Sequence, residues 1–193
     1  KLQGHMSFTE AEDAHNWIQW AFPSPGASDF NSNSLTSSPA FQKLMKESRE
    51  LREVLLLCLR YYLNFMGLEL DAACTIDSQF SEIKIRLKSD EDRTVVIERL
   101  KGFENNHGKH NLMRSSRIIT SLNVHGLEEY AKAFYWLLTD KQGIEQWNPG
   151  FVARNHSSRL SHWNRSLGKA KNQIIYTLRD VLSLQQSFDR PKF

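Results

Sequence analysis

The stretch FQKLMKESRELREVLLLCLRYYLNFMG, residues 41–67, decides the fold of this chain, because apolar residues recur through it at helical spacing. The apolar positions that follow or widen this spacing include Phe41, Leu44, Met45, Leu51, Val54, Leu55, Leu57, Cys58, Leu59, Tyr61, Tyr62 and Phe65. A surface wider than one stripe predicts a helix buried on most sides. Ser38 and Pro39 suit its start and Gly67 its end. We therefore expect one helix, from Ala40 to Met66, at the centre of the domain.

The rest of the chain also predicts helices. Thr9–Phe22 begins with a cap residue and acids and stops before Pro23. Residues 112–122 and 127–139 have helical spacing and meet at Gly126, which predicts an αα-hairpin. A last amphipathic helix is expected over residues 156–187. The predicted fold class is all-α, a single helical bundle of five to seven helices around the buried central helix.

One segment has two interpretations. In Leu68–Lys88 the apolar Ile83, Ile85 and Leu87 alternate with charged residues, which is a strand pattern. A strand needs a partner, and LELDAACTI, residues 68–76, could supply one in a small β-hairpin. A helical or irregular segment is the alternative, and the sequence leaves both open.

Length and composition place the chain among ordinary globular proteins. It has 193 residues, of which 40% are hydrophobic and 24% charged. No apolar run approaches the roughly 18 residues of a membrane span. We expect Cys58 and Cys74 to be free thiols in a reducing, intracellular setting, nuclear or cytoplasmic. We assign residues 1–6 to a tag remnant, 7–150 to the helical domain, and 151–193 to a basic amphipathic helix.

The positive charge is concentrated near the C-terminus. Residues 151–193 hold eight Lys and Arg against two Asp and Glu, while the whole chain carries only +3. The candidates for contacting nucleic-acid phosphates are Arg154, Arg159, Arg165, Lys169, Lys171 and Arg179. The alternative is a solvated face opposite the apolar stripe of the last helix. That stripe could also mediate homo-oligomerisation.

Two motifs resemble one family. HNWIQWAFPSPGASDFNSNS, residues 15–34, resembles the opening signature of the opioid growth factor receptor conserved domain, with Ala21 in place of the usual Leu. The corresponding residues are His15, Trp17, Ile18, Gln19, Trp20, Phe22, Pro23 and Asn31. HNLMRSSRIITSLNVHGLEEYAKAF, residues 110–134, resembles the second signature. Its corresponding residues are His110, Asn111, Arg114, Arg117, Ile118, Ser121, Leu122, Gly126 and Leu127, and it departs at Met113, Ser115 and Ser116.

The resemblance covers roughly Ala14–Leu138 and implies an all-helical domain without enzymatic activity. For the animal family it implies a receptor for an enkephalin-type growth factor that is associated with the nucleus. The final basic helix is less clearly part of the resemblance.

The polar residues of the two motifs are the candidate binding site. His15 and Gln19 share one helix face, and His110, Arg114 and Arg117 share another. Together with Asn31 and Asn111 they could hold a carboxylate or a phosphate of a partner. The alternative is internal pairing of the arginines with acids such as Glu10, Glu12 or Glu47. Trp17 and Trp20 could contact a partner, or they could pack the first helix onto the central one.

No catalytic motif or metal-ligand set is present in the sequence. His107 and His110 have HxxH spacing but no third ligand near them, so we predict no metal and no cofactor. We predict a non-enzymatic interaction module that binds a protein or peptide partner, in a groove bordered by the Ser24–Ser38 loop and the His110/Arg114/Arg117 face. A nucleic-acid-binding adaptor is the alternative, and an enzyme of unknown type comes third.

Overall fold

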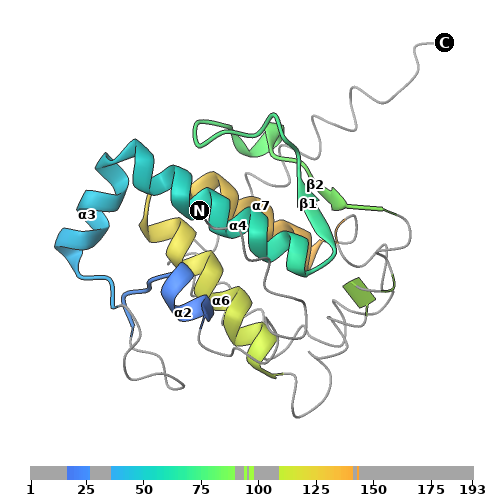
Figure 1. Ribbon diagram of the computed structural model, residues 1–193, viewed down its shortest axis with the longest axis horizontal. Helices are drawn as coiled ribbons and strands as arrows, with labels where there is room; N and C mark the ends of the chain where they lie inside the picture. Colours follow the sequence, from blue (N-terminus) through green and yellow to red (C-terminus); the bar gives the residue numbers. More distant parts are fainter. Residues whose placement is uncertain are drawn as a thin grey trace, which may run out of the picture.

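The computed structural model describes residues 17–26, 36–89, 94, 96, 97, 109–140 and 143. Its elements are α2 (Trp17–Ala21), α3 (Pro39–Glu47), α4 (Arg49–Phe65), β1 (Leu68–Leu70), the 3-10 turn η1 (Phe80–Glu82), β2 (Ile85–Leu87), α6 (Lys109–Val124) and α7 (Glu128–Thr139). Helices dominate, and one small sheet accompanies them (Figure 1). This confirms the predicted fold class and, for the ambiguous segment, the hairpin.

The predicted central helix is two helices. Ser48 has extended backbone angles, φ −88° and ψ 119°, and its hydroxyl accepts a hydrogen bond from the Leu51 amide at 3.2 Å. Its own amide donates to the Leu44 carbonyl, so this single residue ends α3 and caps α4. The prediction of one unbroken helix from Ala40 to Met66 is therefore wrong at Ser48.

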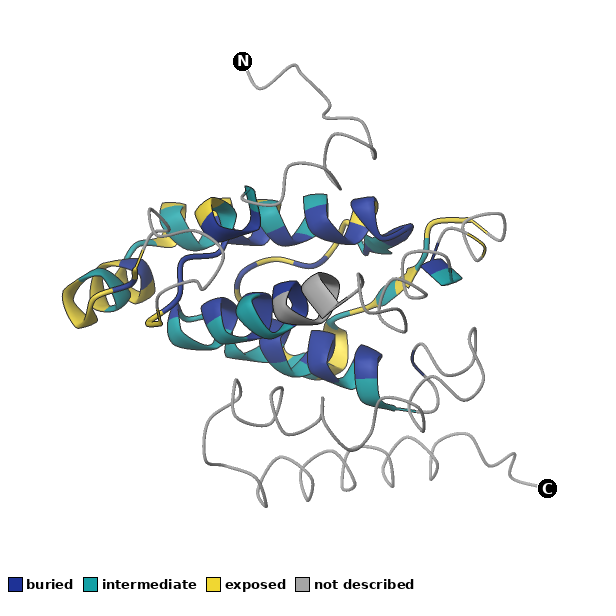
Figure 2. Cartoon of the chain, turned by 90° about the horizontal axis from the view of Figure 1, so that it is seen from below, coloured by how far each residue is buried: buried dark blue, intermediate teal, exposed yellow. Residues whose placement is uncertain are grey.

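The core lies between α4 and the α6–α7 hairpin. Figure 2 shows the buried residues of these helices facing one another. Tyr62 of α4 meets Phe134 of α7 edge to face, with ring centroids 5.9 Å apart. The predicted burial of α4 holds for this side only, because Val54 and Leu57 on its outward face are 57% and 58% exposed.

The hairpin pairs β1 with β2 in antiparallel register, Leu68 opposite Leu87 and Leu70 opposite Ile85. Arg60 of α4 forms hydrogen bonds with the start of the connection between the two strands. Its guanidinium donates to the carbonyls of Leu70 at 2.8 Å, Asp71 at 3.2 Å and Cys74 at 2.7 Å. One planar side chain thus binds three backbone carbonyls at the end of β1 and in the connection after it.

The turn between α6 and α7 depends on Gly126. Its φ of +84° lies in the left-handed region, and the next amide, that of Leu127, donates to the Leu122 carbonyl at 3.0 Å. The predicted αα-hairpin is confirmed. The described helices include none long and apolar enough to cross a membrane.

Candidate binding surface

Arg117 brings the two signature motifs together. From α6 its Nε donates to the Phe22 carbonyl at 2.8 Å and its Nη2 to the Gln19 carbonyl at 3.4 Å. Both carbonyls belong to the end of α2, where a helix leaves acceptors without intrahelical partners. The guanidinium therefore caps α2 from a position nearly a hundred residues later in the chain.

The arginines of the candidate site do not form an open anion-binding face. Arg114 is only 5% exposed. Arg117 is partly buried, and this burial lowers the pKa of its guanidinium. Glu47, one acid considered as an internal partner, lies 3.8 Å from Lys43 instead. Gln19 is buried beside Arg117, so these three residues lie in or near the core.

The other sequence candidates lie outside what the structure describes. His15 and Asn31 are outside the described residues, as are Glu10, Glu12 and the first part of the predicted Thr9–Phe22 helix. His110 and Asn111 lie in the first turn of α6, where the backbone is described but the side chains are not. The basic C-terminal candidates are also outside the described part: Arg154, Arg159, Arg165, Lys169, Lys171 and Arg179.

The two tryptophans of α2 have different surroundings. Trp17 packs on α4, with ring centroids 5.6 Å from Tyr61 and 6.3 Å from Phe65. Trp20, one turn later, is 50% exposed. Packing of the first helix onto the central one is thus carried by Trp17, and Trp20 is left at the surface.

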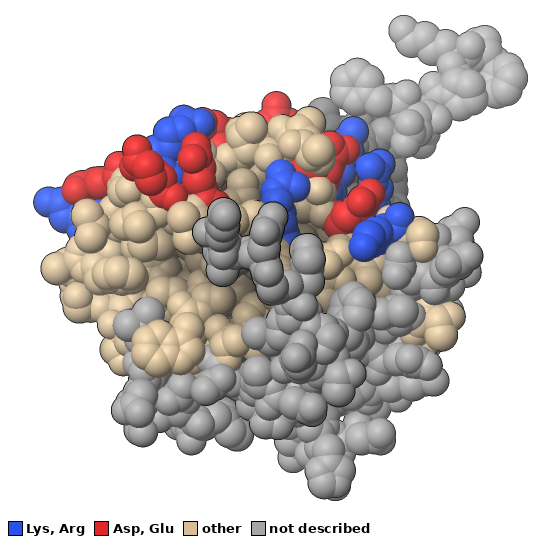
Figure 3. Space-filling model, viewed as in Figure 1, with Lys and Arg blue, Asp and Glu red and all other residues tan. Residues whose placement is uncertain are grey.

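Three aliphatic side chains are exposed beside charged ones on α3 and α4. Leu44 is 54% exposed, and Val54 and Leu57 lie one turn apart on α4. The exposed acids Glu50 and Glu53 share the same helix. On the face drawn in Figure 3, described charged side chains gather along the edge formed by α3, α4 and the hairpin, next to a broad surface without charges.

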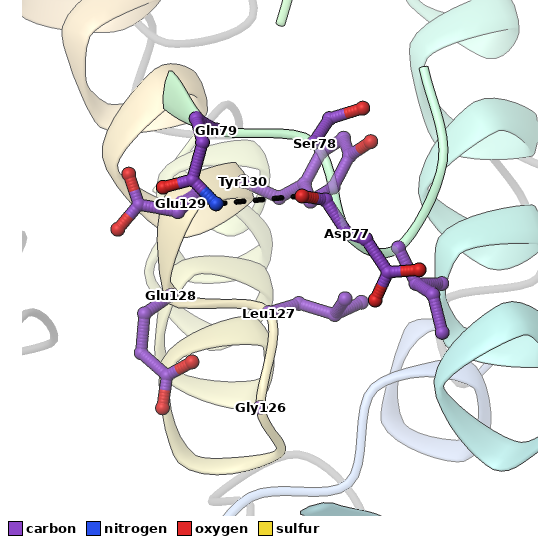
Figure 4. Close-up of a pocket in the computed structure, with 9 residues that line it drawn as sticks. Asp77, Ser78, Gln79, Gly126, Leu127, Glu128, Glu129 and Tyr130 are labelled. Atoms are coloured by element: carbon purple, nitrogen blue, oxygen red, sulfur yellow. Dashed lines mark hydrogen bonds between the residues drawn. The ribbon is translucent and has the colours of Figure 1, made fainter. Parts of the chain in front are cut away.

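A hollow of about 320 Å³ opens between the connection at residues 76–79 and the start of α7. We call it the α7 hollow. In Figure 4 the Leu127 side chain reaches across it toward Asp77, while the carboxylates of Glu128 and Glu129 turn outward. Behind it the Tyr130 hydroxyl donates to the Thr75 carbonyl at 2.6 Å.

The acids of the α7 hollow already have partners. Asp77 accepts from Arg49 Nη1 at 3.0 Å, and Glu128 lies 3.8 Å from Lys46 Nζ. Glu129 accepts from the Phe80 amide at 3.2 Å and pairs with Lys132. These contacts join η1 and α3 to the first turn of α7 and α4 to the connection at Asp77, so the carboxylates make contacts within the fold.

His125 is the residue that sequence reasoning missed. It is fully buried in the α6–α7 turn, with Nε2 2.8 Å from Ser37 Oγ and Nδ1 3.2 Å from Ser121 Oγ. Ser121 lies four residues earlier on α6 and could have been inferred from helical spacing. Ser37 is 88 residues away in sequence, and no local pattern identifies it.

Both cysteines are free thiols, as predicted. Cys74 is buried, and burial raises the pKa of the partly buried Cys58. Within the described segments no group of three or more His, Cys, Asp and Glu residues could hold a metal ion.

Comparison with known proteins gives one match. No curated protein and no solved structure matches the chain. Residues 3–165 match the family described as the opioid growth factor receptor (OGFr) conserved region. The matched residues include both signature motifs. In the structure, the hydrogen bond from Arg117 to the Phe22 carbonyl joins these two motifs. The chain belongs to the opioid growth factor receptor conserved-region family.

Proposed function

We propose that this chain is a non-enzymatic interaction module that binds a protein or peptide partner through the outward face of α4. The exposure of Val54 and Leu57, two apolar side chains one turn apart on a helix whose other face is packed into the core, supports this proposal. Membership of the receptor family is consistent with it. The groove predicted at Arg114 and Arg117 receives less support, because those side chains lie in or near the core.

The apolar side chains on this face could contribute to the free energy of binding a partner. Burying the exposed parts of Val54 and Leu57 on a partner would contribute roughly 2 kcal/mol. Leu44 on the adjoining helix could extend the apolar contact. Glu50 and Glu53 would supply a polar rim that excludes water and orients the partner.

Affinity capture from the native source tests the proposal. Wild-type protein and Leu57→Asp would be compared, with Asn64→Asp as the matched control, because it places the same charge at an exposed position of the same helix. We expect capture of a partner to be lost for Leu57→Asp and kept for Asn64→Asp. Equal capture by both variants would contradict the assignment of the α4 face.

Two further arms separate the alternatives. Nuclease treatment that abolishes all capture would favour the nucleic-acid-binding adaptor predicted from the basic C-terminal residues. Titration with an enkephalin-type peptide tests whether the ligand implied for the animal family binds here. Binding of the peptide that is weakened by Leu57→Asp would assign it to the α4 face.

A further inference from the structure

His125 joins the α6–α7 turn to residues 37–41, which lie more than 80 positions earlier in the sequence. It lies in the α6–α7 turn, its ring meets Phe41 of α3 edge to face at 5.8 Å, and its Nε2 contacts Ser37 in the segment before α3. Ser37 in turn donates its amide to the Ser24 carbonyl at 2.9 Å. The imidazole therefore anchors the point at which the Ser24–Ser38 connection returns to the core.

Both ring nitrogens are used in a way that suits a neutral imidazole. A neutral ring has one N–H donor and one lone-pair acceptor, and a serine hydroxyl can serve either. Ser37 and Ser121 supply these two hydroxyls, and both are buried. No water-exposed edge of the ring is left to stabilise a positive charge.

The charged groups around the ring also disfavour its protonation. Burial has the largest effect and lowers the pKa of His125, a hydrogen bond with the Ser121 backbone raises it, and the nearby Lys46 of α3 lowers it. On α4, Arg52 packs next to the neighbouring Gly126. From α7, Glu128 is directed to Lys46 at 3.8 Å. The contacts from α6 and from the described part of the connection, Ser121 and Ser37, are uncharged.

We propose that His125 is a pH-sensitive latch: protonation on mild acidification releases Ser37 and opens the Ser24–Gly26 and Thr36–Ser38 segments while α4, α6 and α7 stay folded. The step is a proton transfer from hydronium to the imidazole, which leaves water, and no other covalent bond changes. This device does not depend on the proposed binding at the outward face of α4.

The opening would be local because, among the described residues, few hydrogen bonds hold these segments. Besides the His125 contact, Ser37 has the amide bond to Ser24 and accepts from Gln42 Nε2 at 2.9 Å. The helices share a continuous apolar core, and the His125 ring meets its edge at Phe41. Local openings in proteins occur at such weakly held connections.

The direction of the pH effect follows from the preference of the closed form for the neutral ring. The contribution of the His125 contacts to the stability of the closed form is fully present above the pKa of an accessible histidine, about 6.5. It is lost as the pH falls below that value. If the closed form stays neutral, the opening constant rises about eightfold between pH 7 and pH 5.5.

Hydrogen exchange of the Ser37 amide tests the proposal on the full chain. After correction for the intrinsic rate, we expect its protection to fall about eightfold from pH 7 to pH 5.5. The backbone amides of α4 and α7 should keep their protection against exchange over the same pH range. In His125→Gln, which keeps a donor and an acceptor but does not titrate, the Ser37 amide should lose this pH dependence.

Three results would overturn the proposal. The first is a Ser37 amide in the wild type whose protection against exchange is the same at pH 7 and pH 5.5. The second is an equal loss of protection throughout α4 and α7. The third is a Ser37 amide in His125→Gln that shows the same pH dependence as in the wild type. If that variant does not fold, NMR titration of the His125 ring in the wild type decides. The closed form prefers the neutral ring, so in the folded protein the ring should gain its proton only at a pH below the pKa of an accessible histidine, about 6.5, and a ring that titrates at or above this value contradicts the latch.

Discussion

Arg117 Nε lies 2.8 Å from the carbonyl oxygen of Phe22, and this bond attaches the end of α2 to the middle of α6. Nη2 of the same side chain reaches the Gln19 carbonyl. Only arginine offers a planar fork of donors that can meet two neighbouring carbonyls from one position. The two family signatures are therefore joined by a side chain of one and the backbone of the other.

Replacing Arg117 with Met keeps an unbranched side chain and removes both donors. The Phe22 carbonyl, in a fully buried residue, would lose this partner. We expect the free energy of unfolding to fall by about 1–3 kcal/mol, measured by urea denaturation. Arg86→Met is the control, because Arg86 pairs with Glu69 on the exposed surface of the hairpin and its replacement should change stability much less. Equal effects of the two variants would contradict the capping role.

Periodicity predicted the elements whose contacts are local. The α6–α7 hairpin follows from apolar spacing and from Gly126, whereas the alternation around Ile85 left the β-hairpin as one of two interpretations, which the structure decides. The break at Ser48 could not be decided, because serine fits both a helix interior and an N-cap, and its spacing continues the apolar face. The sequence also shows which residues are apolar but not which are covered, so the exposure of Val54 and Leu57 was not foreseen.

The candidate site was harder to predict than the fold. Arg117 was identified as functional because arginine suits anions, yet it binds backbone carbonyls, which leave no trace in a sequence. Arg60 also binds backbone carbonyls, in the hairpin connection, and the sequence does not indicate these contacts. The His125–Ser37 pair is a contact between single residues across 88 positions, so only the folded chain identifies it.

Arg60→Ala should weaken the attachment of the hairpin to α4. The carbonyls of Leu70, Asp71 and Cys74 would lose charge-assisted hydrogen bonds. We expect a loss of about 2–4 kcal/mol in the free energy of unfolding by urea denaturation. Arg60→Lys keeps the charge but not the fork, so its loss should be intermediate. If Lys restores full stability, charge rather than geometry explains the contact.

Gly126→Ala should destabilise the α6–α7 turn. A side chain at φ +84° is strained, and the added Cβ would lie 3.3 Å from Lys46 Cα and 3.1 Å from Arg52 Cδ. We expect a loss of about 1–2 kcal/mol, seen as a lower melting temperature in calorimetry. Gly26→Ala is the control, since nothing lies within 4 Å of its added Cβ. A Gly126→Ala protein that melts like the control would show that the turn tolerates a side chain.

Cys58 should react slowly with iodoacetamide in the folded protein. The thiolate is the nucleophile, and burial raises the pKa of the Cys58 thiol, so less thiolate is present at pH 8 than in an exposed cysteine. We expect alkylation, followed by mass spectrometry of the Cys58 peptide, to be slower than in urea and to accelerate as the pH rises. Cys74, which is buried, gives a second protected thiol in the same experiment. Labelling of Cys58 at the same rate with and without urea would contradict its partial burial against the core, and a Cys58–Cys74 disulfide would contradict the free thiols.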